Sequence, residues 1–105
     1  MNSGDPDATA GLREAALAFA NSFGAVLDIA PTDGAAFHVD GRAEKPVVRP
    51  GLSPEPAQCA WSAPLDDLRR IFEGGRALES AYLSGRLKIS GDMSVMARLK
   101  LQSRR

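Results

Sequence analysis

Cysteine and histidine are almost missing from this chain of 105 residues, which contains one of each, Cys59 and His38. A single thiol cannot form an internal disulfide, and its solitary use is typical of a reducing compartment. The sequence also lacks paired histidines, Cys and His at metal-binding spacing, and the glycine-flanked serine of many hydrolases. We therefore predict no metal site, no catalytic residues and no cofactor, and we interpret the chain as a protein other than an enzyme.

An excess of charge of either sign and long apolar runs are lacking too. The 13 basic residues balance the 13 acidic ones, so nucleic acid is a poor candidate for the partner. No apolar stretch is long enough to cross a bilayer, and the first residues, MNSGDPDATAG, have neither the basic nor the apolar region of a signal peptide. We therefore expect a cytoplasmic protein.

The few reactive groups are isolated from one another in the sequence. Cys59 lies in the strand-like stretch AQCAWS, and we expect it to be a small buried hydrophobic residue. His38 is expected on the polar face of a strand, as a solvated or hydrogen-bonded surface group. Asp66 and Asp67 would point about 100° apart on a helix, so we expect first-turn charges there and not a carboxylate pair.

The composition is that of an ordinary globular domain, with 44% hydrophobic and 25% charged residues. We expect residues 1–10 to be a disordered leader and residues 11–105 to form a single domain. A helix is predicted from Leu12 to Phe23, because apolar residues recur there at the spacing of one helical face. Gly24 is expected to end that helix.

The rest of the chain alternates between strand and helix patterns. Alternation of apolar and polar residues predicts strands that have one covered face, as in antiparallel meanders. The predicted strands are residues 25–30, 35–40, 46–49, 58–62 and 87–90, and a proline-rich loop is predicted at 51–57. Helices are predicted from Pro64 to the glycines at 74 and 75, from Ala77 to Ser84, and from Met93 to Leu101. Gly85 is expected to end the second of these helices, and the carboxylate of Asp92 to cap the third.

The stretch SGRLKISGDM at residues 84–93, with the methionine- and leucine-rich helix that follows it, resembles the C-terminal signature of sterol carrier protein 2 (SCP-2-like) domains. The order of the other predicted elements agrees with that family. The resemblance implies an α+β fold in which helices pack on one face of a curved, mostly antiparallel sheet of about five strands. It also implies a hydrophobic tunnel between the two layers, which holds fatty acyl chains, sterols or similar lipids.

On this resemblance we expect the chain to bind and transfer an intracellular lipid, which would be a fatty acyl, sterol-like or isoprenoid compound. The large apolar side chains expected to contact the ligand are Phe19, Phe23, Trp61, Leu68, Ile71, Phe72, Leu83, Met93, Met96 and Leu99. Two alternatives stay open. One is an accessory carrier for quinone-type isoprenoid intermediates, and the other is a non-catalytic structural or dimerisation domain with a collapsed pocket.

Charge is distributed unevenly along the chain, since residues 86–105 contain six basic residues and one acidic residue. Each cation near an anionic bilayer contributes about 1 kcal/mol to binding. We therefore expect transient contact with an anionic membrane surface through Arg98, Lys100, Arg104 and Arg105. The chain ends without the peroxisomal tripeptide of eukaryotic carriers, which favours a bacterial cytosolic setting.

Overall fold

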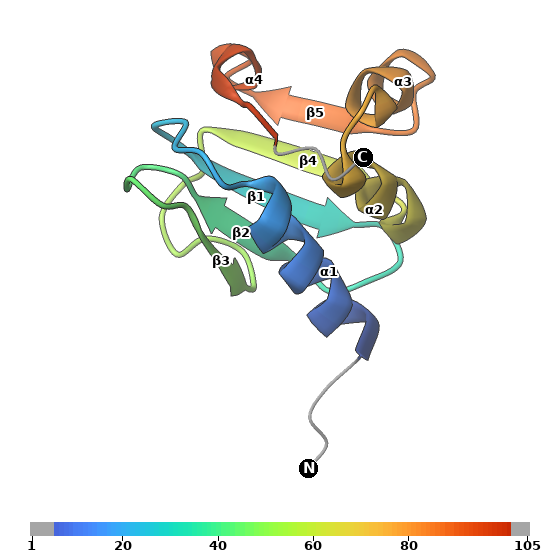
Figure 1. Cartoon of the computed structure of the whole chain (residues 1–105), viewed down its shortest axis with the longest axis horizontal. Coiled ribbons are helices and arrows are strands. Elements are labelled where there is room, and N and C mark those ends of the chain that lie inside the picture. Colours follow the sequence, from blue (N-terminus) through green and yellow to red (C-terminus); the bar gives the residue numbers. More distant parts are fainter. Residues whose placement is uncertain (1–5, 102–105) are drawn as a thin grey trace.

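The computed structural model describes residues 6–101, with side chains from residue 12 onward. Within this range the chain forms four helices and five strands, and helices α1 and α2 lie side by side over one face of the sheet (Figure 1). In chain order the elements are α1 (Pro6–Ala18), β1 (Val26–Pro31), β2 (Phe37–Asp40), β3 (Val47–Pro50), β4 (Cys59–Ala63), α2 (Leu65–Glu73), α3 (Ala77–Leu83), β5 (Lys88–Gly91) and α4 (Ser94–Arg98). The predicted α+β architecture is confirmed.

The described strands form one sheet with the order β3-β2-β1-β4-β5. Three neighbouring pairs are antiparallel, and the central pair, β1 with β4, is parallel. The sheet is therefore mostly antiparallel, as predicted, but it is not a simple meander. A parallel pair needs a crossover connection, and the segment between β3 and β4 carries the chain back across β2 and β1.

The core lies between the sheet and the helices α1 and α2. The strand register aligns four apolar residues in one row across the sheet, namely Phe37, Ile29, Trp61 and Ile89. The ring of Phe19 fills the space above this row, with its centroid 5.9 Å from those of Trp61 and Phe72. Both of these partners are buried. Side chains thus fill this part of the interface between the layers, and the tunnel that the resemblance implied is not shown.

Helix α1 lies further toward the N-terminus than predicted. It begins at Pro6, inside the segment predicted to be a disordered leader, and residues 1–5 of that segment lie outside the described residues. Proline suits a first helical turn because no intrahelical partner is needed for its nitrogen, and the alanines that follow favour helix. The helix stops short of Phe23 because the carbonyl of Gly41 accepts hydrogen bonds from the N–H groups of Phe23 and Gly24, at 3.0 and 2.8 Å.

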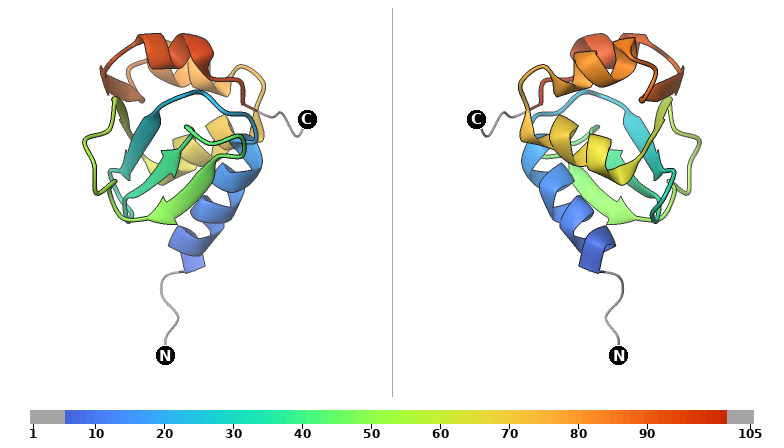
Figure 2. Two further views of the ribbon diagram at one scale, coloured as in Figure 1. Left: turned by 90° about the vertical axis from the view of Figure 1, so that its left-hand side faces the viewer. Right: turned by 90° about the vertical axis from the view of Figure 1, so that its right-hand side faces the viewer.

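The loop at residues 51–58 covers the face of the sheet opposite to α1 and α2 (Figure 2). Its backbone is held by strand side chains: Nδ1 of His38 donates to the carbonyl of Gly51 at 2.7 Å, and the N–H of Ser53 donates to Asp28 at 2.9 Å. His38 is only 6% exposed. His38 is therefore hydrogen-bonded on the polar face of its strand, as predicted, but it is not a surface group, because this loop shields the outer face of β2 from solvent.

The turns around β5 match the predicted chemistry. Gly85 follows α3 with φ +82°, and its N–H donates to the carbonyl of Tyr82 at 3.1 Å, as expected of a glycine that ends a helix. Gly91 has φ +94°, and a Cβ there would lie 2.5 Å from the carbonyl oxygen of Gln58. The carboxylate of Asp92 accepts a hydrogen bond from the N–H of Ser94 at 2.9 Å, which confirms its predicted capping contact.

Helix α4 is shorter than predicted and ends at Arg98. Leu99 has the extended dihedral angles φ −73° and ψ 135°. In the segment that follows, Leu99 and Leu101 are half-buried and Lys100 between them is exposed, which is the alternation of an extended chain. The carbonyl of Lys100 accepts a hydrogen bond from Nδ2 of Asn21 at 3.2 Å, and this contact holds the extended segment against the connection between α1 and β1.

Candidate functional site

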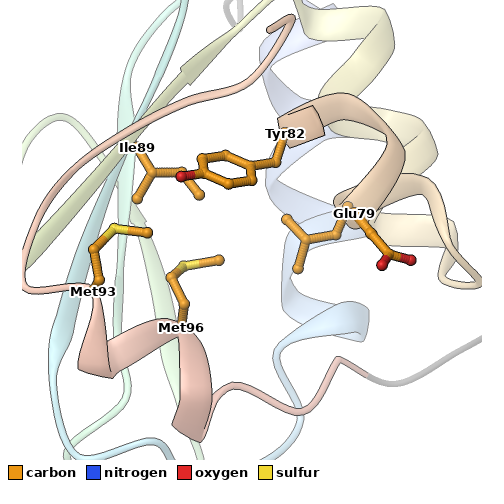
Figure 3. Close-up of a pocket in the computed structure, with 6 residues that line it drawn as sticks. Glu79, Tyr82, Ile89, Met93 and Met96 are labelled. Carbon is orange, nitrogen blue, oxygen red and sulfur yellow. The ribbon is translucent and has the colours of Figure 1, made fainter. Parts of the chain in front are cut away.

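An apolar pocket of about 250 Å³, here called the methionine pocket, lies between α3, β5 and α4 (Figure 3). Its lining residues are Leu78, Glu79 and Tyr82 from α3, Ile89 from β5, and Met93 and Met96 at and within α4. Tyr82 is 47% exposed and Met93 is 45% exposed, so the pocket is open to solvent on the side where these side chains lie. In Figure 3 the ring of Tyr82 extends across the pocket toward Ile89.

Helical spacing brings these side chains together. Leu78 and Tyr82 are four residues apart on α3 and point to the same side, while Ala81 is buried in the core. Met93 and Met96 are three residues apart and share one side of the last helix in the same way. Both are thioether side chains with several rotatable bonds, which suits a wall that adapts to different occupants.

A second apolar pocket, here called the glycine pocket, has a volume of about 390 Å³ and adjoins the first. It is lined by Ile71, Gly74, Gly75, Leu78, Leu99 and Leu101. Gly74 and Gly75 both have positive φ angles, 102° and 71°, and form the turn between α2 and α3. The extended end of the described chain, at Leu99 and Leu101, closes the opposite side.

Leu78 lines both pockets and is half-buried between them. We call the two pockets together the two-pocket groove. Pockets for drug-sized ligands typically have volumes of about 300–1,000 Å³. Each pocket alone lies at or near the lower end of that range, and the Leu78 side chain stands between them.

Met96 separates the methionine pocket from the aromatic core. The indole Nε1–H of Trp61 donates to the sulfur of Met96, with an N–S distance of 3.2 Å. Trp61 itself is 1% exposed and does not line the pocket. This hydrogen bond holds the Met96 side chain on the side that faces the sheet.

The ten residues predicted to contact a ligand fall into three groups. Met93 and Met96 line the methionine pocket, and Ile71 and Leu99 line the glycine pocket. Five others are buried in the core, namely Phe19, Phe23, Trp61, Leu68 and Phe72. Leu83 is 75% exposed and lines neither pocket. Apolar periodicity does not distinguish a core position from a pocket wall, and this explains why both kinds were predicted together.

Several lining residues were missed by the sequence analysis, above all Leu78, Tyr82 and Ile89. A signal for the first two was present, since their spacing of four residues on a short helix marks a shared face. Ile89 was predicted to lie, with Leu87, on the apolar face of a strand that has one wet face. Only the strand register shows that it stands beside Trp61 and next to the methionines.

A polar pocket of about 290 Å³ lies on the opposite face of the sheet, between β2, β3 and the loop at residues 51–58. The guanidinium of Arg42 forms ion pairs there with Asp40 and Glu55, each at 2.8 Å. Hydrogen bonds from the side chain and backbone N–H of Arg42 lower the pKa of Asp40 to about 2. His38 lines this pocket and is engaged with the backbone of Gly51, so these groups fasten the loop to the sheet.

The remaining reactive groups of the described part of the chain, Cys59 and His38, lie apart from each other. Cys59 is buried in the core on the helix side of the sheet, and burial raises the pKa of its thiol, which keeps it in the unreactive protonated form. His38 lies on the other face. Within residues 6–101, no cluster of three or more His, Cys, Asp or Glu side chains could hold a metal ion. No described helix is long and apolar enough to pass through a bilayer.

Arg98 and Lys100, predicted to contact a membrane, are both exposed. Arg104 and Arg105 lie outside the described residues. Arg98 belongs to α4, the helix that also carries Met96, so at least one of the predicted docking cations lies close to the methionine pocket. Lys88 on β5 is exposed as well.

The fold and the groove place this chain in the class of small α+β domains that have apolar pockets between their last helices and the edge of a five-stranded sheet. The sequence model of the SCP-2 sterol transfer family matches residues 7–101, and the chain belongs to this family. Family membership supports lipid or sterol binding and transfer in general. Among curated protein sequences, none matches this chain.

Solved structures with the same fold agree with this membership. The solution structure of the sterol carrier protein domain 2 of Helicoverpa armigera matches with a TM-score of 0.72 and 15% identity, over 93% of this chain and 88% of that one. The ubiquinone synthesis protein UbiJ-SCP2 matches with a TM-score of 0.60 and 19% identity, over 90% and 75% of the two chains. The palmitated SCP2L2 of Aedes aegypti matches with a TM-score of 0.51 and 26% identity, over 70% and 66%.

Proposed function

We propose that this chain binds a single apolar lipid chain in the two-pocket groove and carries it between membranes or enzymes without catalysing a reaction on it. The observation that carries the proposal is the methionine pocket, whose wall consists mostly of apolar side chains from three elements and which is open to solvent beside Tyr82 and Met93. Each buried methylene contributes about 0.8 kcal/mol, so an alkyl chain can be held there without a specific polar contact.

The ligand class is supported by the family and by one of its solved members. The family's description is sterol transfer, and the Aedes aegypti protein carries palmitate. A fatty acyl chain is narrow enough to follow a groove that bends around Leu78. A sterol-like or isoprenoid ligand would require a larger opening between α3 and α4, which the short α4 and its flexible methionines would permit.

A narrower function is favoured by a different observation. The likeness to UbiJ-SCP2, a ubiquinone synthesis protein, covers 90% of this chain. An accessory carrier for quinone-type isoprenoid intermediates would use the same groove for the isoprenoid tail. The third possibility, a structural or dimerisation domain with a collapsed pocket, gains support from the packed aromatic core but leaves the open methionine pocket without a purpose.

We also propose that the carrier approaches anionic membranes with the edge that contains α4. The side chains of Met93 and Leu83 are exposed, and the cations Lys88, Arg98 and Lys100 accompany them on β5 and the last segment. Apolar groups beside cations suit a bilayer interface, and contact there would bring the mouth of the methionine pocket close to the lipid.

The proposal is tested by titrating the full chain with a fluorescent long-chain fatty acid and displacing it with palmitate, a sterol and an isoprenoid quinone. Leu78→Trp fills the junction of the two pockets and should weaken binding at least tenfold. Leu83→Trp is the matched control, because Leu83 is exposed and lines neither pocket, and it should bind as the wild type does. Absence of saturable binding of every lipid to folded wild-type protein would refute the carrier function. Equal binding by both variants would place the ligand elsewhere.

A further inference from the structure

The indole N–H of Trp61 is a polar group placed directly behind the apolar wall of the methionine pocket. Its nitrogen lies 3.2 Å from the sulfur of Met96, and the indole is 1% exposed. A buried indole N–H normally has a hydrogen-bond acceptor, and a thioether sulfur is a weak one. The donor is therefore satisfied only weakly in the empty protein.

The acceptor belongs to a side chain that can adopt other positions once its weak contact with Trp61 is replaced. Met96 is half-buried, belongs to a helix of five residues, and is flanked by exposed residues at positions 97 and 98. The methionine side chain has three rotatable bonds and adapts to its surroundings at low cost. Rotation of its thioether would expose Nε1 of Trp61 to the pocket.

The strand register shows that this donor stands at the inner end of the pocket. Trp61 on β4 is paired with Ile89 on β5, and Ile89 lines the methionine pocket. Neighbouring strands lie about 4.8 Å apart, so the indole lies one strand deeper than the wall that the ligand would touch first. An apolar chain that enters beside Tyr82 and Met93 would point its leading end toward Trp61.

The charges around the pocket determine which kind of oxygen atom can be buried there as an acceptor for the indole N–H. Among the described lining residues the charged one is Glu79, whose carboxylate is exposed and pairs with Arg76 at 3.2 Å. No cation of the described lining could compensate a buried carboxylate, and burying an unpaired charge is costly. A neutral carbonyl or hydroxyl oxygen has no such cost.

We propose that the methionine pocket selects lipids that carry a neutral oxygen acceptor, a ketone, ester or alcohol, and that Nε1 of Trp61 donates its hydrogen bond to this oxygen in place of the sulfur of Met96. This inference rests on the proposed function, because it requires that a lipid enters the groove. It adds a polar determinant at the inner end of a pocket whose other polar lining residues are Glu79 and Tyr82. A free carboxylate would instead remain at the solvent-exposed mouth.

The test compares the methyl ketone of thirteen carbons with tridecane, both delivered to the full chain from cyclodextrin. Trp61 is the single tryptophan, so its indole N–H gives one signal in a nitrogen–proton correlation spectrum. The ketone should move this signal further downfield than the alkane does, and it should bind about three- to tenfold more tightly, as expected for one exchanged hydrogen bond.

Two variants complete the test. Trp61→Phe removes the donor and should abolish the preference for the ketone. Met96→Leu removes the sulfur at nearly constant volume and should keep or increase the preference, because the indole then lacks its internal acceptor. Equal affinity of the wild type for ketone and alkane, with the indole signal unmoved, would overturn the inference and leave the proposed function intact. Failure of both compounds and of palmitate to bind would instead refute the proposed function.

Discussion

The carboxylate of Asp67, in the first turn of α2, lies 3.1 Å from Nε of Arg86, in the turn before β5. Asp67 is only 8% exposed, and the sequence indicated no more than a charge in the first turn of a helix. The pair connects α2 to the α3–β5 turn and so holds α3 in place along the two-pocket groove. Asp67, which the sequence indicates only as a charge that favours the helix dipole, therefore also helps to position the candidate site.

Arg86→Gln should lower the free energy of unfolding by about 1–2 kcal/mol, because it leaves the buried carboxylate without its charged donor. Arg70→Gln is the matched control, since Arg70 is 3.7 Å from the same carboxylate but its own side chain is 66% exposed. It should cost less than about 0.5 kcal/mol. Urea denaturation of both variants measures these losses. Equal losses of unfolding free energy would show that Arg86 stabilises the fold no more than Arg70 does.

Asp40 should give the stability curve a specific dependence on pH. Its pKa is lowered to about 2, mainly by hydrogen bonds from Arg42, so the stabilisation from its ionised form is complete above the pKa of the unfolded chain, near 4, and is lost as the pH falls toward 2. Its side chain is 32% exposed and that of Arg42 is 51% exposed, so the contribution is about 0.5–1 kcal/mol.

The measurement for Asp40 is the difference in unfolding free energy between wild type and Asp40→Asn from pH 7 to pH 2. The difference should be constant down to about pH 5 and shrink below it. In an Arg42→Gln background the same substitution should have a small effect at every pH. A difference that grows toward low pH would contradict the direction of the shift.

His38 and Cys59 should be dispensable for binding. Neither lines the methionine pocket or the glycine pocket, and the two lie on opposite faces of the sheet. The double variant His38→Gln, Cys59→Ala should bind lipid within a few-fold of the wild type, while losing about 1–3 kcal/mol of stability through the altered contact with Gly51 and the cavity at position 59. Any turnover activity that disappears in this variant would argue against a carrier without catalysis.

Membrane contact should depend on the basic residues near the end of the chain. Changing Arg98, Lys100, Arg104 and Arg105 to Gln should reduce co-sedimentation with anionic vesicles by at least an order of magnitude, since each cation near the surface contributes about 1 kcal/mol. Binding of the wild type should fall as salt is raised. Neutral vesicles provide the control. Equal binding to both vesicle types, insensitive to salt and to the fourfold change, would leave these cations as a solubility feature.

Much of the fold could be predicted because local signals were strong. Each strand is delimited by glycine, proline or a polar turn, so the observed strands lie within two residues of the predicted ones. Gly85 and Asp92 were identified correctly for the same reason. The ends of α1 and α4 were predicted wrongly, because contacts between residues distant in sequence determine them. The carbonyl of Gly41 binds the chain just after α1, and Asn21 holds the extended chain that follows α4.

The candidate site was predicted only in part. Met93 and Met96 were found because they share a helical face in the most recognisable stretch of the sequence. Phe19 and Phe72, which were also predicted to contact the ligand, are buried and contact each other and the rings of Trp61 and Phe37. Whether apolar side chains meet one another or enclose a space depends on tertiary packing, which the order of residues alone does not specify.

The most direct test of the account uses the three methionines of the chain. Met93 and Met96 line the methionine pocket, and Met1 lies outside the described residues. Protein labelled with ¹³C at the methionine methyl groups should be titrated with palmitate and followed by NMR. The signals of Met93 and Met96 should shift together and saturate at one lipid per chain. Binding of palmitate that leaves both internal methionine signals unchanged would contradict the assignment of the groove as the lipid site.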